Sequence, residues 1–155
     1  MAPIYKILVA VDLSRYASPL VEYAAQLART FDAELLLAGV IDQRLVDALG
    51  MLIKKHSGPA VDVFVKDKEQ AYAQQLQALV QYAGCEDRDV RLFVRTGVPF
   101  KAILSIIDEE APDLLIMGTK GRTNLADVVI GSCAEKLFRR SPIPVLTLPA
   151  DYTQD

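Results

Sequence analysis

Residues 4–12 read Ile-Tyr-Lys-Ile-Leu-Val-Ala-Val-Asp and contain the first predicted strand. Aliphatic and β-branched side chains fill this run almost without interruption, and Asp12 ends it. Such a run is typical of a parallel strand covered on both faces, because an exposed face would call for alternating polar residues. The sequence therefore predicts a buried, central strand over residues 4–11.

An amphipathic helix and a second buried strand follow this run. Ser14 or Ser18 is a candidate helix cap, Pro19 stands near the helix start, and apolar residues recur at three- and four-residue steps up to Phe31. Residues 34–41, Glu-Leu-Leu-Leu-Ala-Gly-Val-Ile, are again apolar. Two buried strands joined by a helix form a right-handed βαβ unit, so the sheet is predicted to be at least partly parallel.

The segment from residue 42 to residue 66 contains two different patterns of apolar residues. The spacing of its first leucines, from Leu45 to Leu52, predicts a helix, whereas residues 61–65, Val-Asp-Val-Phe-Val, alternate as a strand does. Ser57, Gly58 and Pro59 are predicted to form the turn between them.

The remaining elements alternate in type to the end of the chain. We predict helices over 67–83, about 99–110 and 132–140, and strands over 90–95, 114–117 and 144–148. Charged residues alternate with apolar ones in the 90–95 strand, which is typical of an edge or half-covered position. This order predicts a single doubly wound α/β domain over residues 1–150, followed by a frayed tail at 151–155.

Composition excludes several classes of protein. The chain has 155 residues, 17 basic and 20 acidic side chains and a formal net charge of −3, without the basic clusters of a nucleic-acid binder. Its longest apolar run, residues 35–41, is too short to span a membrane. Cys85 and Cys133 lack metal-ligand spacing and are expected to be reduced thiols. We expect a soluble, cytoplasmic protein with no nucleic-acid or membrane partner.

A candidate ligand site follows from where the strands end. In open parallel sheets, ligands bind beyond the carboxyl ends of the strands, where successive connections leave for opposite faces. Asp12 ends the first strand, and the 114–117 strand runs into Gly118 and Gly121, with Gly131 and Ser132 opening the last helix in the spacing G-x2-G-x9-G-S. Glycines permit positive φ and close approach of backbone N–H groups, and a helix N-terminus favours phosphate.

Each of these residues also has a purely structural interpretation. Gly118 and Gly121 suit a turn, Ser132 suits a helix cap, and Asp12 suits the end of a strand. Neighbouring Lys120 and Arg122 suit either ligand contact or solvent exposure. The chain has no GxxxxGK[ST] motif and no GxGxxG after the first strand, so a nucleotide pocket here would be of a different kind.

The sequence resembles the universal stress protein family, from Ile4 to Leu148. The resemblance rests on four segments: Val-Asp-Leu-Ser at 11–14, Met-Gly-Thr-Lys-Gly at 117–121, Gly-Ser-Cys-Ala-Glu-Lys-Leu at 131–137 and Ser-Pro-Ile-Pro-Val-Leu at 141–146. The glycine signature is that of the family's ATP-binding branch. The resemblance implies a Rossmann-like domain with a mostly parallel five-stranded sheet in the order 3-2-1-4-5 and helices on both faces, which places Asp12 beside Gly118.

The resemblance also implies a role for each site residue. Asp12 is expected at the ribose or the adenine, and Val40 and Ala10 beside the adenine. The phosphates are expected at Gly118, Gly121, Gly131 and Ser132, with Met117 and Cys133 bordering the pocket. Cys133 is a departure, because small aliphatic or hydroxyl residues are commoner there. The expected ligand is ATP, with AMP and ADP as alternatives and Mg²⁺ or Mn²⁺ as candidate companions of the phosphates.

The leading hypothesis is an ATP-binding stress-response protein with a nucleotide-dependent state. The motifs supply a phosphate cradle without an evident base, and His56 lies where a solvated imidazole is expected, so hydrolysis is expected to be slow at most. The alternatives are a weak metal-dependent ATP hydrolase and a nucleotide-free dimer that acts by protein contacts. A homodimer is expected through the apolar edge strand from Pro144 to Leu148, unless its prolines blunt that edge.

Overall fold

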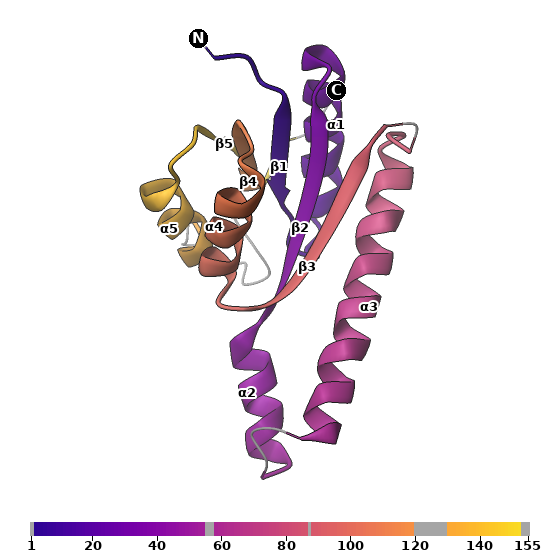
Figure 1. Ribbon diagram of the computed structural model, residues 1–155, viewed down its shortest axis with the longest axis vertical. Coiled ribbons are helices and arrows are strands. Elements are labelled where there is room, and N and C mark those ends of the chain that lie inside the picture. Colours follow the sequence, from indigo (N-terminus) through magenta and orange to yellow (C-terminus); the bar gives the residue numbers. More distant parts are fainter. Residues whose placement is uncertain (1, 55–57, 87, 120–129, 153–155) are drawn as a thin grey trace.

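In the computed structural model, strands and helices alternate along the chain except between the second and third strands, where two helices follow one another (Figure 1). The structure describes residues 2–54, 58–86, 88–119 and 130–152. The elements in chain order are β1 (Lys6–Ala10), α1 (Ala17–Phe31), β2 (Glu34–Asp42), α2 (Gln43–Leu52), α3 (Pro59–Tyr82), β3 (Val90–Gly97), α4 (Pro99–Glu110), β4 (Leu114–Gly118), α5 (Ser132–Arg140) and β5 (Val145–Leu148).

The five strands form one parallel sheet in the order β3-β2-β1-β4-β5. β1 lies at the centre, where Leu8 is in register with Leu36 of β2 on one side and with Leu115 of β4 on the other. The predicted doubly wound fold, its central first strand and the strand order implied by the family resemblance are therefore confirmed. β3 and β5 are the two edges of the sheet.

Successive side chains of each buried strand enter two different cores, because their directions alternate across the sheet. Ile7 and Val9 of β1 pack in the core beneath α1 and α3, together with residues such as Leu76. Leu8 packs in the opposite core beneath α4 and α5, with residues such as Ile106. The continuous apolar run of residues 4–11 reflects this burial on both faces.

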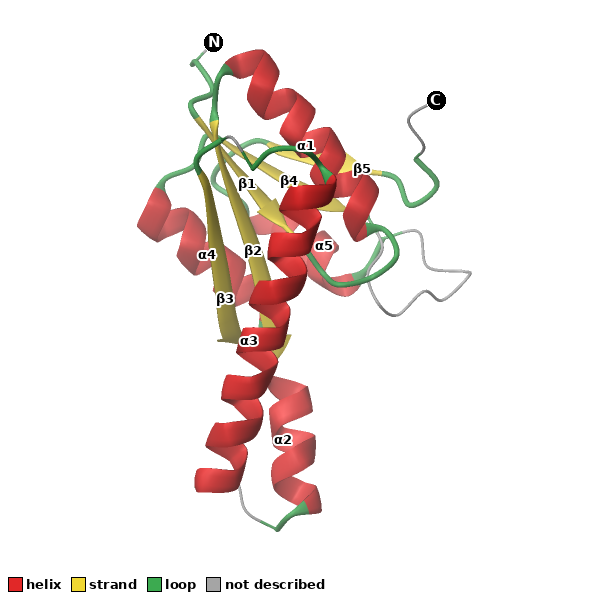
Figure 2. Cartoon of the chain, turned by 90° about the vertical axis from the view of Figure 1, so that its right-hand side faces the viewer, coloured by secondary structure: helices red, strands yellow, loops and turns green. Residues whose placement is uncertain are grey.

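The strand predicted over residues 61–65 is wrong. These residues lie in α3, which begins with Pro59 at its first turn after Gly58, whose φ is 122°. Val61 is buried against the core, whereas Val63 is 58% exposed, so the alternating pattern does not mark one face of a sheet. The helix predicted from Leu45 onward is confirmed as α2. Figure 2 shows α2 and the first half of α3 side by side beyond the ends of the strands.

Neither predicted serine cap is present at the start of α1. Tyr16 occupies the N-cap position without a side-chain capping bond, and Ser18 lies inside the helix. The hydroxyl of Ser14 instead donates to Oδ1 of Asp12 at 2.6 Å. This serine orders the loop after β1, which matters for the site described below.

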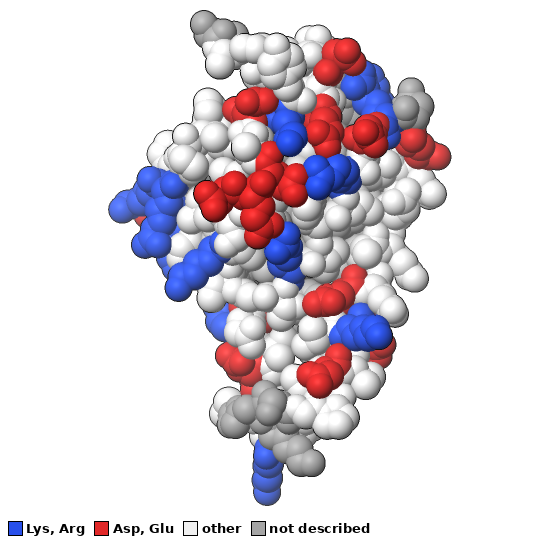
Figure 3. Space-filling view, in the orientation of Figure 1, with Lys and Arg blue, Asp and Glu red and all other residues white. Residues whose placement is uncertain are grey.

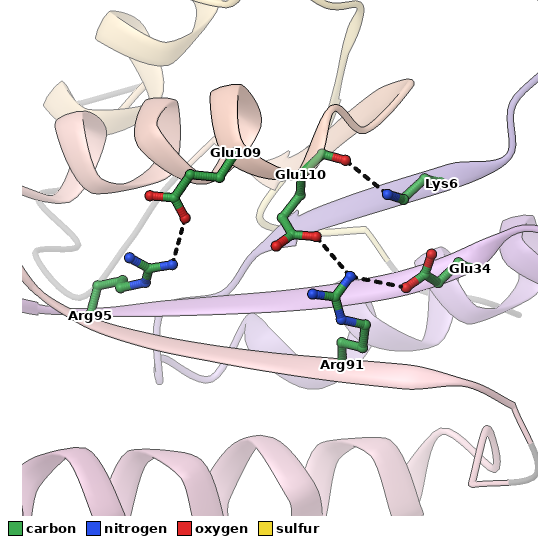
Figure 4. A network of polar contacts seen from close by, with 6 residues as sticks. All are labelled: Lys6, Glu34, Arg91, Arg95, Glu109 and Glu110. Atoms are coloured by element: carbon green, nitrogen blue, oxygen red, sulfur yellow. Dashed lines mark hydrogen bonds and ion pairs between the residues drawn. The ribbon is translucent and has the colours of Figure 1, made fainter.

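An ionic network joins the edge strand β3 to α4 and to the inner strands (Figure 4). Nη1 of Arg91 lies 2.7 Å from Oε2 of Glu110 and 3.4 Å from Oε1 of Glu34, and Nζ of Lys6 donates to the Glu110 carbonyl at 2.8 Å. The hydrogen bond with Arg91 lowers the pKa of Glu110. Partly exposed pairs of this kind contribute little stability, but charged side chains along an edge strand discourage pairing with another chain.

Acidic and basic side chains lie interspersed among uncharged residues on the face drawn in Figure 3. Across the described ranges, no helix combines the length and the apolar character that crossing a membrane requires. Within the predicted tail, Tyr152 packs edge-on against Tyr23 with ring centroids 5.5 Å apart. Residues 153–155 lie outside the described residues.

Candidate functional site

The carboxyl ends of β1, β2 and β4 open into a cleft of about 340 Å³. The amino-terminal ends of α4 and α5 close one side of it, and α1 and α3 reach it from the other face of the sheet. Its lining residues are Ala10, Val11, Asp12, Tyr16, Leu20, Ala38, Val40, Asp42, Arg44, Tyr72, Pro99, Ile103, Met117, Gly118, Thr119, Gly131, Ser132, Cys133, Ala134 and Leu137. A volume of this size is within the usual range for small-molecule sites.

The structure brings almost all of the predicted site residues to this one cleft. The residues that line it are Ala10, Asp12, Val40, Met117, Gly118, Gly131, Ser132 and Cys133. Gly121 lies outside the described residues, as do Lys120 and Arg122. Residues 108 positions apart in the chain, Ala10 and Gly118, meet here because β1 and β4 are neighbours in the sheet.

Asp12 is held in a hydrogen-bonded turn at the mouth of the cleft. Its Oδ1 accepts from the Ser14 hydroxyl at 2.6 Å and from the Ser14 N–H at 3.3 Å, and the same hydroxyl accepts from the Tyr16 N–H at 3.2 Å. These bonds fix the carboxylate by local contacts two residues away in the chain. An ionised carboxylate has about four acceptor positions, so it can accept further bonds from a ligand.

The start of α5 provides a second polar wall. Gly131 is at the N-cap position, its N–H donates to the carbonyl of Thr119 at 2.7 Å, and no side chain caps the helix. The first-turn N–H groups of an α-helix lack partners within the helix and carry a partial positive charge. Gly131 has a φ of −67°, so it does not use the positive φ that glycine permits. Because Gly131 has no side chain, it still allows an anion to approach the backbone N–H groups closely, as predicted for the glycines of this site.

The interior of the cleft is apolar. Ala38 and Met117 from the strands, Ile103 from α4 and Leu137 from α5 line it, and each is buried. A flat apolar group can therefore lie between the sheet and the two helices while polar groups remain at the mouth. This division between an apolar interior and a few convergent polar groups is typical of ligand sites.

An ion pair stands at the rim where β2 ends. Arg44, whose side chain is 88% exposed, donates from Nη2 to Oδ2 of Asp42 at 2.7 Å and from Nε to both oxygens. The hydrogen bond from Arg44 to Asp42 raises the pKa of the guanidinium. Asp42 also accepts from the Arg44 N–H at 3.0 Å, which caps α2. The start of α2 is thus part of the cleft wall.

Cys133 borders the cleft as a neutral thiol. Burial raises its pKa to about 11, the carboxylates of Asp12 and Asp42 act in the same direction, and Lys136 opposes them. The thiol is therefore protonated at neutral pH, and a thiol rather than a thiolate is a weak nucleophile. In this position Cys133 acts as a small apolar side chain.

Sequence reasoning missed Tyr16, Asp42, Arg44 and Tyr72, which also line the cleft. Asp42 and Arg44 directly follow the apolar run that ends at Ile41, so the strand-end rule that singled out Asp12 would have found them. Tyr72 comes from a helix distant in sequence. The signal that could have indicated it is a glycine within a buried strand, because such a glycine often marks a place where another group approaches the strand closely. Among the described side chains, no group of three His, Cys, Asp or Glu residues could hold a metal ion. His56 lies outside the described residues.

Comparisons with known proteins agree on one family. The chain is 27% identical to the universal stress protein MJ0577 of Methanocaldococcus jannaschii over 151 residues, covering 92% of this chain and 93% of the relative. The solved structure of MJ0577 superposes with a TM-score of 0.81 at 22% identity, covering 98% of this chain and 100% of the other. At that identity the superposition shows the fold alone.

Two further similar structures are complexes with a nucleotide. One is a universal stress protein in complex with cAMP, with a TM-score of 0.66, 22% identity and coverage of 97% and 100% of the two chains. The other is the universal stress protein of Archaeoglobus fulgidus in complex with dAMP, with a TM-score of 0.60, 17% identity and coverage of 94% and 98%. The model of the universal stress protein family matches residues 4–149. The chain belongs to the universal stress protein family.

Proposed function

We propose that this protein binds an adenine nucleotide in the cleft, with ATP as the first candidate and AMP or ADP as alternatives, and that the bound state serves a regulatory role in the stress response. The observation that carries the proposal is the joint lining of one cleft by a carboxylate and an uncapped helix N-terminus around an apolar interior. A nucleotide combines three groups that match these parts: a flat base, a ribose with hydroxyl donors, and phosphates.

Each part of the ligand has a matching wall. The base lies in the apolar interior beside Ala10, Val40 and Met117, and a ribose hydroxyl donates to Asp12. The phosphates accept hydrogen bonds from the first-turn N–H groups of α5 that follow Gly131 and from the Ser132 hydroxyl, next to Gly118. Gly121 is assigned to the phosphates as well, by its place in the glycine signature. Mg²⁺ or Mn²⁺ is proposed as a companion of the phosphates rather than as an ion held by protein ligands.

The ligands of similar proteins support an adenine nucleotide. The cAMP and dAMP of the two solved complexes share adenine, a ribose-type sugar and phosphate. We also propose that the protein acts in the cytoplasm, since the Cys133 thiol forms no disulfide, as is usual in a reducing compartment.

Calorimetric titration with ATP, AMP and GTP tests the proposal. Wild-type protein is expected to bind ATP or AMP more tightly than GTP. Asp12→Ala and Ser132→Ala are expected to weaken binding by about 10- to 100-fold and about 3- to 10-fold, because they remove a charged and a neutral hydrogen-bonding partner respectively. Asp108→Asn and Ser105→Ala on the exposed face of α4 are the matched controls.

The same samples separate the alternatives. If wild-type protein shows neither heat of binding nor a rise in melting temperature with millimolar adenine nucleotide, the proposal fails. Metal-dependent phosphate release that Asp12→Ala abolishes would instead support a weak ATP hydrolase.

We further propose that the protein forms a homodimer through β5. This strand is an edge of the sheet, and its Val145 and Leu146 are only partly buried. An apolar edge strand favours pairing with a second chain, because its backbone groups on the open side need partners. Sedimentation at tens of micromolar is expected to show a dimer that Val145→Lys dissociates. A monomer for the wild-type protein, unaffected by the substitution, would contradict this proposal.

A further inference from the structure

A tyrosine of α3 reaches the cleft from the opposite face of the sheet. Tyr72 is only 5% exposed, lines the cleft, and donates from Oη to the carbonyl of Val11 at 2.7 Å. Val11 directly precedes Asp12, the carboxylate proposed to meet the ribose. A helix more than 60 residues away in sequence therefore fixes the backbone from which that carboxylate extends.

A second, independent observation concerns Gly39 in the middle of β2. A Cβ built on this glycine would lie 2.7 Å from Cδ1 and Cζ of the Tyr72 ring and closer still to Cε1. Ordinary carbon–carbon contacts are about 3.5 Å or longer, so only glycine leaves room for the ring at this position. The strand thus carries the one residue type that lets Tyr72 cross it toward Val11.

Both helices of the α2–α3 hairpin meet the cleft, although much of the hairpin extends beyond the sheet (Figure 1, Figure 2). α2 starts there through its capping residue Asp42 and through Arg44. α3 reaches it through Tyr72. α3 and the Val11–Asp12 backbone are therefore joined by the hydrogen bond from Tyr72 to the Val11 carbonyl.

We propose that Tyr72 is a positioning residue that couples nucleotide binding to the α2–α3 hairpin. Its hydroxyl holds Val11, and hence Asp12, in the arrangement that accepts the ligand. Because coupling free energies are reciprocal, a bound nucleotide stabilises the packing of α3 by the same factor by which that packing improves affinity. This inference rests on the proposed function, and it names the hairpin as the part of the molecule that responds to occupancy.

Tyr72→Phe tests the positioning role, because it keeps the ring and removes only the hydroxyl. Calorimetric titration with AMP well below the melting temperature is expected to show affinity about 5- to 10-fold weaker than in the wild type, as a buried carbonyl loses its partner and the competent arrangement is less populated. Tyr82→Phe, on the same helix with a side chain 70% exposed, is the matched control and is expected to bind as wild type does. A purely structural role would lower the melting temperature and leave this affinity unchanged.

Hydrogen exchange tests the coupling first in the wild type, which needs no variant, and then in Tyr72→Phe. In the wild type, saturating AMP is expected to slow exchange in α3 around Tyr72 as well as at the cleft, and in Tyr72→Phe the effect on α3 is expected to be lost while the cleft remains protected. An α3 that does not respond to AMP in the wild type, or Tyr72→Phe affinity within twofold of the wild type, would overturn the inference. If the wild type binds no AMP or ATP at all, the proposed function itself fails and the inference fails with it.

Discussion

Replacing Gly39 with alanine is expected to destabilise the protein strongly for a substitution that adds one methyl group. The new Cβ would lie 2.7 Å from two atoms of the Tyr72 ring and closer still to Cε1, so the ring must move by more than about 1 Å to reach ordinary contact. That movement breaks its 2.7 Å hydrogen bond to Val11. Overpacking of a core costs about 1–3 kcal/mol and the lost hydrogen bond about 1 kcal/mol, while alanine regains about 0.5–1 kcal/mol over glycine in a strand.

The net expectation is a loss of about 1–3.5 kcal/mol in the free energy of unfolding, or a melting temperature roughly 2–14 °C lower for a domain of this size. Urea denaturation followed by circular dichroism measures it. Gly97→Ala is the matched control, because a Cβ at that position meets nothing within 4 Å and the backbone needs no positive φ. Equal stability of Gly39→Ala and the wild type would refute the account of how Tyr72 is seated.

Two other predictions concern the amino-terminal ends of β1 and β4 and the thiol beside the cleft. Asp113→Ala removes a carboxylate oxygen that accepts from the N–H groups of Tyr5 and Lys6 at 2.8 and 3.0 Å. The free energy of unfolding, measured by urea denaturation, is expected to fall by about 1.5–3 kcal/mol. A fall below about 0.5 kcal/mol would contradict this role. Alkylation of Cys133 by iodoacetamide, followed by mass spectrometry, is expected to keep accelerating with pH through pH 9, the ordinary thiol pKa, toward about 11. In the unfolded chain this thiol ionises near pH 9, whereas in the folded protein it ionises near pH 11. Ionisation of Cys133 therefore lowers the free energy of unfolding as the pH rises from about 9 toward about 11. A rate that levels off near pH 9 would show a solvated thiol.

The fold was largely predictable because its strands are buried on both faces. Runs such as residues 34–41 leave no polar alternation to confuse them with exposed strands, and the helices between them require parallel pairing. The failure at residues 61–65 has a local cause. Valines at positions 61, 63 and 65 satisfy the alternating pattern of a strand, but Pro59 after a glycine starts a helix, and the following Lys, Glu, Gln and Ala residues continue it.

The site was predictable as far as strand ends and glycines announce it. Gly118 is the last residue of β4 and Asp12 comes two residues after the end of β1, so the strand order alone places them together. Tyr72 could not be inferred in this way, because its approach depends on how α3 crosses the sheet. The predicted cap at Ser14 failed for a local reason. Its hydroxyl lies two residues from the Asp12 carboxylate and donates to it, instead of capping α1.

Equilibrium dialysis of the purified protein against millimolar ATP tests the central claim most directly. The account predicts roughly one nucleotide retained per chain, displaced by AMP and much reduced in Asp12→Ala, because a single cleft carries the carboxylate and the helix N-terminus together. Equal nucleotide concentrations on both sides of the membrane for the wild-type protein would contradict it.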